Sequence, residues 1–230
     1  MQARLIESFE IAPGVRHFVF EALDVEKLDF IPGQFVSFSG MMNGREITRA
    51  YSIASAPPLS GSRFELCLNL VPDGAFTPYL FEMKPGDVVE MRPPLGLFTL
   101  RHPGRDSILV ATGTGIAPFR SILQAHLKRS SPGFTLIFGV RHETSLLYRS
   151  EFEEMARCFS NFRFWPTLTR PGPDWTGRSG RVQAHLTEAI AGRRDVDFLV
   201  CGLKPMVDEA RTILKQGGFD RKQILYEKYD

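Results

Sequence analysis

The residues best suited to bind a flat, phosphate-bearing ligand lie in a short alternating segment, residues 49–55. In a strand, Arg49, Tyr51 and Ile53 share one face, and Ala50 and Ser52 share the other. A guanidinium pairs bidentately with phosphate oxygens, and an aromatic face stacks on a flat heterocycle. The spacing favours a nucleotide-like ligand, but an exposed arginine beside a core tyrosine would give the same pattern on a plain strand.

A second candidate is the turn at Gly113, Thr114 and Gly115, where an apolar segment gives way to an amphipathic one. Paired glycines allow a tight turn, and the N-terminus of a following helix offers backbone N–H groups to a pyrophosphate. Pro118 suits the first turn of that helix. However, Pro118 stands where the dinucleotide-binding fingerprint GxGxxG has its third glycine, so the motif is incomplete. The prediction therefore rests on the position of the turn directly after a strand.

Two further segments have chemistry that depends on their surroundings. Gly74, Ala75, Phe76 and Thr77 open a short predicted helix, whose positive end would attract phosphate; a simple helix cap would use the same residues without a ligand. Cys201 precedes Gly202 at the end of a predicted strand. A cysteine on an apolar strand is more often a small buried hydrophobe than a site residue.

The hydrophobic pattern that predicts the surrounding strands and helices differs between the two halves of the chain. Residues 1–101 offer short alternating runs separated by Pro, Gly, Asn and Asp, which is typical of an antiparallel β-barrel or sandwich. One short helix is predicted over residues 76–83. We place the domain boundary in the segment around residue 103, which gives domains 1–103 and 104–230.

The second domain is predicted to be α/β, a doubly wound parallel five-stranded sheet. Its strands are expected at 107–111, 134–139, 163–169, 198–201 and 224–227, and its helices at 117–129, 150–158, 181–191 and 204–216. Parallel strands need such crossovers, and ligands bind beyond the carboxyl ends of the strands.

Composition excludes several classes of protein. No apolar stretch approaches the roughly 20 residues of a membrane helix, and the acidic N-terminal segment is unlike a secretory signal, so we expect a cytoplasmic protein. Three scattered cysteines and five histidines lack the spacing of a disulfide framework or a metal site. Residues 1–103 hold 9 basic and 12 acidic side chains and the remainder 19 and 14, with no basic run that would indicate nucleic acid.

Three segments taken together resemble the ferredoxin–NADP reductase family of flavoproteins: RAYSIAS at 49–55, ATGTGIAPFRSIL at 111–123 and VCGLKPM at 200–206. The resemblance covers nearly the whole chain in order. It implies an N-terminal antiparallel β-barrel that binds FAD and a C-terminal domain that binds NADP(H).

The resemblance also implies individual roles. Arg49 would contact the flavin phosphates, Tyr51 would pack against the isoalloxazine and Ser52 would hydrogen-bond near flavin N5. Cys201 would stand beside the nicotinamide as a compact neighbour, and Glu227 and Tyr229 resemble a C-terminal acid and a flavin-covering aromatic. The remaining cofactor-binding residues implied are Ala50, Gly74, Ala75, Phe76, Thr77, Thr114, Gly115, Pro118, Gly202 and Leu203.

The roles of two segments, residues 169–178 and the C-terminus, leave alternatives open. Thr169, Arg170 and Arg178 resemble residues that hold the adenosine 2′-phosphate of NADPH, but they could also be surface residues of a loop. The chain continues past Tyr229 to Asp230, which could draw the terminus away from a flavin.

We therefore expect a monomeric FAD enzyme that moves a hydride between NADPH and flavin and single electrons between flavin and a ferredoxin or similar small redox protein. Since this chain has no cysteine cluster, the acceptor is expected to be separate. The alternatives are the NAD(P)H-dependent reductase component of a multicomponent oxygenase, a free-flavin reductase, or a non-catalytic flavin-binding electron-transfer subunit.

Overall fold

The computed structural model describes residues 1–42 and 44–229. The chain divides into two compact units. The first unit contains Met1–Thr99 and Ala117–Ala125, and the second contains Leu100–Ile116 and the chain from His126 onward. Because neither unit is continuous in sequence, the division into 1–103 and 104–230 stays a prediction of domain boundaries.

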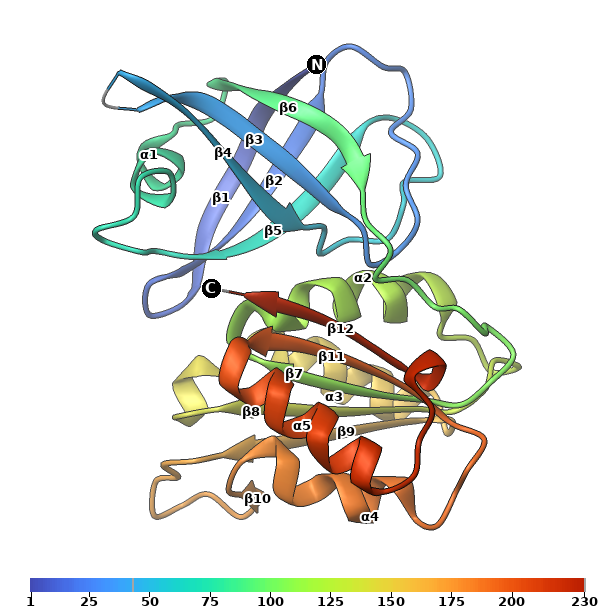
Figure 1. The fold of residues 1–230 in the computed structure, drawn as a ribbon. Helices are drawn as coiled ribbons and strands as arrows, with labels where there is room; N and C mark the ends of the chain where they lie inside the picture. Colours follow the sequence, from blue (N-terminus) through green and yellow to red (C-terminus); the bar gives the residue numbers. More distant parts are fainter. Residues whose placement is uncertain (43, 230) are drawn as a thin grey trace. The chain divides into compact units, whose positions relative to one another are not determined.

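The first unit is built on a six-stranded antiparallel sheet in the order β4-β3-β6-β1-β2-β5 (Figure 1). Its two outer strands meet beyond the end of β4, where Ile53 pairs with Leu66 and the Ala54 N–H donates to the Glu65 carbonyl at 2.7 Å. The sheet therefore closes on itself as a barrel, and the predicted antiparallel barrel is confirmed. The strands are β1 (Gln2–Ala12), β2 (Val15–Ala22), β3 (Phe35–Met42), β4 (Arg45–Ser52), β5 (Arg63–Asn69) and β6 (Val88–Leu95).

Alternation of apolar and polar residues explains how these strands form one core. Inward residues of the strands, such as Phe18, Phe20 and Phe38, are fully buried. Phe18 stacks on Phe20, and Phe38 meets Phe20 edge-on. The helix α1 (Thr77–Glu82) adds Leu80 to this core. It agrees with the helix predicted over 76–83.

The helix α2 (Ala117–His126) belongs to the first unit through most of its length. Arg120 donates to the Ala54 carbonyl at 2.9 Å and to the Glu65 carboxylate at 2.5 Å, and its side chain is only 11% exposed. The Gln124 side chain accepts the Ala56 N–H at 2.9 Å. Phe119 lies against Phe98, with ring centroids 5.7 Å apart.

The second unit contains a six-stranded parallel sheet in the order β10-β9-β8-β7-β11-β12. The prediction of five strands is wrong by one, because it omitted β10, a two-residue strand that follows a loop. The strands are β7 (Ser107–Thr112), β8 (Phe134–Val140), β9 (Phe162–Leu168), β10 (Arg178–Ser179), β11 (Asp197–Leu203) and β12 (Ile224–Tyr229).

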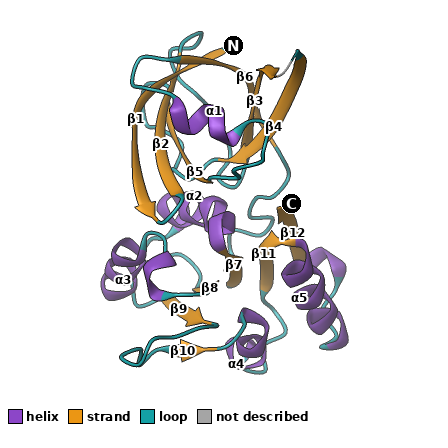
Figure 2. Ribbon diagram, turned by 90° about the vertical axis from the view of Figure 1, so that its left-hand side faces the viewer, coloured by secondary structure: helices purple, strands orange, loops and turns teal. Residues whose placement is uncertain are grey.

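Helices cover both faces of this sheet. Figure 2 shows α3 (Arg149–Cys158) and α5 (Lys204–Gln216) on opposite sides of it. Every residue of β8 is buried, as expected for a parallel strand covered on both faces. The helix expected at 181–191 is instead two short pieces, the 3₁₀ helix η3 (Val182–His185) and α4 (Leu186–Ile190). Within the described part of the chain, no helix is long and apolar enough to cross a membrane.

Candidate cofactor-binding sites

The predicted flavin-binding segment forms the end of β4, and Tyr51 is its central residue. Tyr51 pairs with Val36 of β3, and its ring lies 5.8 Å from that of Phe38 and 6.5 Å from that of Phe76. Its hydroxyl is buried without a hydrogen-bond partner among the described residues. Buried polar groups normally have partners, so this hydroxyl fits a site in which a bound polar ligand supplies one.

Arg49 adds a positive charge on the same face as Tyr51. Burial raises the pKa of the Tyr51 hydroxyl, and the Arg49 charge opposes that rise. Arg49 itself is exposed and donates to the Thr48 carbonyl at 2.9 Å. Ser52, the last residue of β4, is buried opposite Phe35. The end of β4 therefore presents an exposed guanidinium beside a half-buried aromatic ring, and their role in binding FAD stays a prediction.

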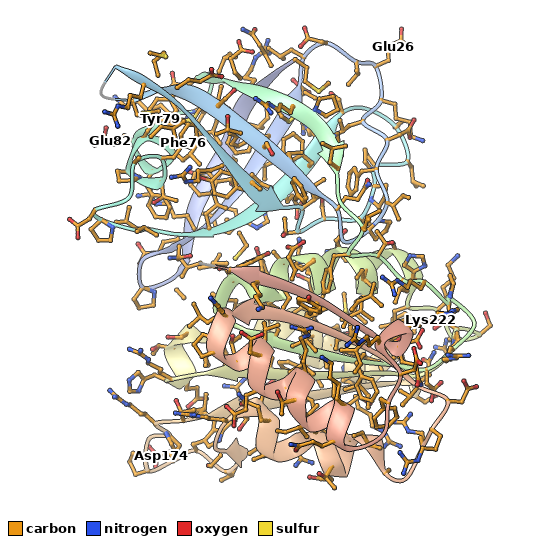
Figure 3. The ribbon with its side chains drawn as sticks, in the orientation of Figure 1. Glu26, Phe76, Tyr79, Glu82, Asp174 and Lys222 are labelled. Carbon is orange, nitrogen blue, oxygen red and sulfur yellow. The ribbon has the colours of Figure 1, made fainter. Side chains whose placement is uncertain are left out.

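The segment formed by Gly74, Ala75, Phe76 and Thr77 is a turn that leads into α1. Gly74 donates its N–H to the Val71 carbonyl at 2.8 Å, and the Thr77 hydroxyl accepts the Val71 N–H at 3.0 Å. Phe76 is 1% exposed and makes an edge contact with Tyr79 at 5.7 Å (Figure 3). The Thr77 hydroxyl thus holds the loop closed and does not cap the helix.

The glycine turn of the second unit is the 3₁₀ helix η1 (Gly113–Ile116), which follows β7. A Cβ atom at Gly115 would lie 2.5 Å from the Cys201 carbonyl oxygen and 2.9 Å from the Gly202 nitrogen. No side chain fits there, so glycine is required for the turn to pack on the end of β11. Pro118 is buried in the first turn of α2.

Three of the predicted catalytic residues meet at the end of the same sheet. Cys201 of β11 is fully buried and lies opposite Glu227 in the register with β12, and Leu203 lies opposite Tyr229. Burial raises the pKa of the Cys201 thiol well above its ordinary value, the negative charge of Glu227 raises it further, and a hydrogen bond with Tyr229 opposes the rise. The thiol is therefore neutral near pH 7, as a compact neighbour and not a nucleophile would be.

Thr112 is a candidate that the sequence analysis missed. It ends β7, and its hydroxyl is buried without a hydrogen-bond partner among the described residues. Gly202 has φ +144°, and a Cβ there would lie 2.3 Å from the Thr112 Oγ1. Its place directly before Gly113 was the available signal, but threonine is an ordinary residue at the end of a strand.

The residues predicted to contact a 2′-phosphate lie around β9 and β10. Thr169 and Arg170 follow β9 and are exposed, with their N–H groups bonded to the carbonyls of Val140 and Arg141. Arg178 lies on β10 opposite Thr167, and its guanidinium is already paired with Glu188. The loop between Arg170 and Arg178 includes Asp174, which is labelled in Figure 3.

Two other expectations concern what the described residues contain. Over residues 1–42 and 44–229, no group of three or more His, Cys, Asp or Glu side chains could hold a metal ion. Asp230, the residue that could draw the terminus away from a flavin, lies outside the described part of the chain.

Comparison with known proteins identifies the families that the two parts of the chain match and a relative of similar length. Residues 2–100 match the family described as the oxidoreductase FAD-binding domain, and residues 109–212 match the oxidoreductase NAD-binding domain. The chain is 39% identical over 239 residues to Ferredoxin--NADP reductase B of Sorangium cellulosum, covering 100% of this chain and 97% of that protein.

Two further similarities involve longer proteins. The chain is 29% identical to the anthranilate 1,2-dioxygenase electron transfer component of Acinetobacter baylyi, over 89% of this chain and 60% of that protein. The crystal structure of the Amycolatopsis cytochrome P450 reductase GcoB superposes with a TM-score of 0.88 at 30% identity, covering 99% of this chain and 69% of that one.

Proposed function

Because the chain belongs to the ferredoxin–NADP reductase family of FAD- and NAD(P)-binding oxidoreductases, we propose that it transfers a hydride between NADPH and FAD and exchanges single electrons with a small redox protein. The observation that carries the proposal is the similarity to Ferredoxin--NADP reductase B, which extends over the whole of this chain. When bound, FAD accepts two electrons together and releases them one at a time. The redox protein is most simply a [2Fe–2S] ferredoxin.

We assign FAD to the first unit. Arg49 pairs with its phosphates, Tyr51 packs on its ring system and Ser52 donates a hydrogen bond near N5. The buried hydroxyl of Tyr51, which lacks a partner among the described residues, supports this assignment. Backbone N–H groups of Ala75, Phe76 and Thr77 bind the pyrophosphate, and Gly74 shapes the turn by donating its N–H to the Val71 carbonyl.

We assign the nicotinamide nucleotide to the carboxyl ends of the strands in the second unit. Cys201 and Glu227 surround the nicotinamide, Tyr229 competes with it, and the neutral, buried thiol contributes shape and excludes water. Thr114 and Gly115 bind the pyrophosphate through backbone N–H groups and the Thr114 hydroxyl, and Thr112 joins them. Pro118, which has no N–H to donate, fixes the first turn of the helix that follows. Arg170, with Thr169, and Arg178 hold the 2′-phosphate.

The experiment that tests this function is anaerobic stopped-flow reduction of the purified holoprotein. NADPH is expected to bleach the flavin faster than NADH, and Arg170→Ala is expected to remove most of that difference. Equal kcat/KM for the two donors, unchanged in Arg170→Ala, would contradict the NADPH assignment. Purification of the protein with FMN alone would contradict the FAD assignment.

A second candidate is the reductase component of an oxygenase, which the similarity to an anthranilate dioxygenase component and a cytochrome P450 reductase favours. Those proteins are longer, and this chain spans 60% and 69% of them. Adding ferredoxins, an oxygenase component and free flavins to the reduced protein in separate reactions distinguishes the acceptors. Preferential reoxidation by a ferredoxin supports the first function; preferential reoxidation by an oxygenase component or free flavin supports an alternative.

A further inference from the structure

The guanidinium of Arg178 and the carboxylate of Glu188 form a bidentate pair. Nη1 and Nη2 of Arg178 donate to the two carboxylate oxygens at 2.5 and 2.6 Å. Arg178 lies on β10 and Glu188 on α4, so the fold of the second unit brings them together across a turn and a 3₁₀ helix. The edge of the guanidinium that grips a carboxylate is the same edge that grips a phosphate.

Trp165 and Trp175 fix Arg178 independently of Glu188. The guanidinium carbon of Arg178 lies 3.8 Å from the centroid of the Trp165 ring on β9. The indole N–H of Trp175 donates to the Arg178 carbonyl at 2.9 Å, which fixes the backbone. Removing the Glu188 carboxylate would therefore release two N–H donors from a guanidinium that stays in place.

Solvent reaches this pair. The side chain of Arg178 is 29% exposed and that of Glu188 is 57% exposed. The hydrogen bond from Arg178 lowers the pKa of Glu188, so the carboxylate is charged at neutral pH. A phosphate dianion that approaches Arg178 thus meets a competitor of like charge on the same donors.

We propose that Glu188 is a specificity-determining residue, which competes with the 2′-phosphate of NADPH for Arg178 and so limits the preference for NADPH over NADH. The inference rests on the proposed function, in which Arg178 holds that phosphate. NADH has hydroxyls only at this position and does not need the occupied donors.

The test is calorimetric binding of adenosine 2′,5′-bisphosphate and of 5′-AMP to the holoprotein, which needs no turnover. In Glu188→Gln the ratio of the two affinities is expected to rise about two- to fivefold in favour of the bisphosphate, the range expected from an exposed ion pair. Glu188→Ala is expected to shift it in the same direction. The matched control is Glu154→Gln, because Glu154 makes a similar bidentate pair with Arg157 on α3; its ratio should equal that of the wild type.

The outcomes separate the inference from the function beneath it. If Arg178→Ala lowers the affinity for the bisphosphate and the two Glu188 variants leave the ratio unchanged, Glu188 does not set specificity although the NADPH assignment stands. A fall in the ratio in both Glu188 variants would make Glu188 a support for Arg178 and overturn the inference. If Arg178→Ala has no effect, the phosphate does not bind at Arg178; the inference and the assignment of Arg178 are then wrong, while Arg170→Ala still tests the proposed function.

Discussion

Arg49 is the residue on which the proposed hold on FAD depends most directly. It is exposed and donates to a neighbouring carbonyl, so replacing it should leave the barrel intact. Arg49→Ala is expected to weaken FAD binding about ten- to hundredfold, because a hydrogen bond to a charged group contributes about 1.5–3 kcal/mol. Fluorescence titration of the apoprotein measures this. Arg45→Ala, at an exposed position of the same strand, is the control, and equal affinities in both variants would exclude Arg49 from the site.

Tyr229 is the residue expected to compete with the nicotinamide. An aromatic pair contributes about 0.5–1.5 kcal/mol beyond burial, so Tyr229→Ser is expected to tighten NADP⁺ binding about two- to tenfold and to raise use of NADH proportionally more. Titration of the oxidised variant, following a flavin charge-transfer band, measures the affinity. Tyr226→Ser is the control, since Tyr226 lies on the same strand with its ring centroid 3.6 Å from the guanidinium carbon of Arg211. An affinity for NADP⁺ and a ratio of NADH to NADPH use identical to wild type would mean that Tyr229 does not compete with the nicotinamide.

Individual site residues could be predicted from the sequence where a motif lies at the end of a predicted strand. The sequence places Cys201 and Glu227 on separate strands, and adjacency of β11 and β12 brings them together. The sequence could not reveal the pairing of Arg178 with Glu188, because nothing local marks two surface charges ten residues apart as partners. The sequence therefore predicts a phosphate site at Arg178 but gives no sign of its pairing with Glu188.

Among the elements, η1 gives the sharpest prediction. Gly115→Ala forces a methyl group against the backbone of β11, so it is expected to destabilise the second unit by about 1–3 kcal/mol and to weaken NADP⁺ binding. Thermal unfolding and nucleotide titration measure the two effects. Gly104→Ala is the control, because a Cβ there meets nothing within 4 Å. A Gly115→Ala protein as stable as Gly104→Ala would show that the turn can move away from the strand.

The elements that were predicted well have long periodic signals. The five strands expected in the second unit are present within a few residues, as are the helices at α3 and α5. β10 has two polar residues and no pattern of its own, and parallel pairing with β9 makes it a strand. The helix predicted to end at residue 129 ends at His126, before a turn in which the Ser131 side chain bonds Lys128.

At the scale of the whole molecule, two histidines make stability depend on pH. Burial, with the charge of Lys128, lowers the pKa of His126; burial, with the charge of Arg178, lowers the pKa of His185. Below about pH 6.5 the unfolded chain binds protons that the folded chain does not yet accept. The free energy of unfolding is therefore expected to fall as the pH drops from 7.5 to 5.5.

Thermal unfolding in saturating FAD at these two pH values tests the dependence. The double variant His126→Gln, His185→Gln is expected to lose less stability on acidification than the wild type. If both proteins lose the same amount, other groups account for the dependence. The window lies above the range in which the carboxylates of Glu154, Glu188 and Asp208, whose pKa values are lowered, would take up protons.

The segment Ala117–Ala125, which belongs to the first unit although it follows part of the second, has a consequence for exchange of domains between relatives. A chimaera joined at residue 103 would combine the Glu65 of one parent with the residue that the other parent has in place of Arg120. Where that residue is not an arginine, the Glu65 carboxylate would lose its ion-pair partner. During synthesis this segment emerges after β7, so its hydrogen bonds with Ala54 and Glu65 form only after all the barrel strands have been made. The two units are therefore interleaved in the sequence. An exchange of either unit between relatives has to keep α2 with the barrel strands of the same parent.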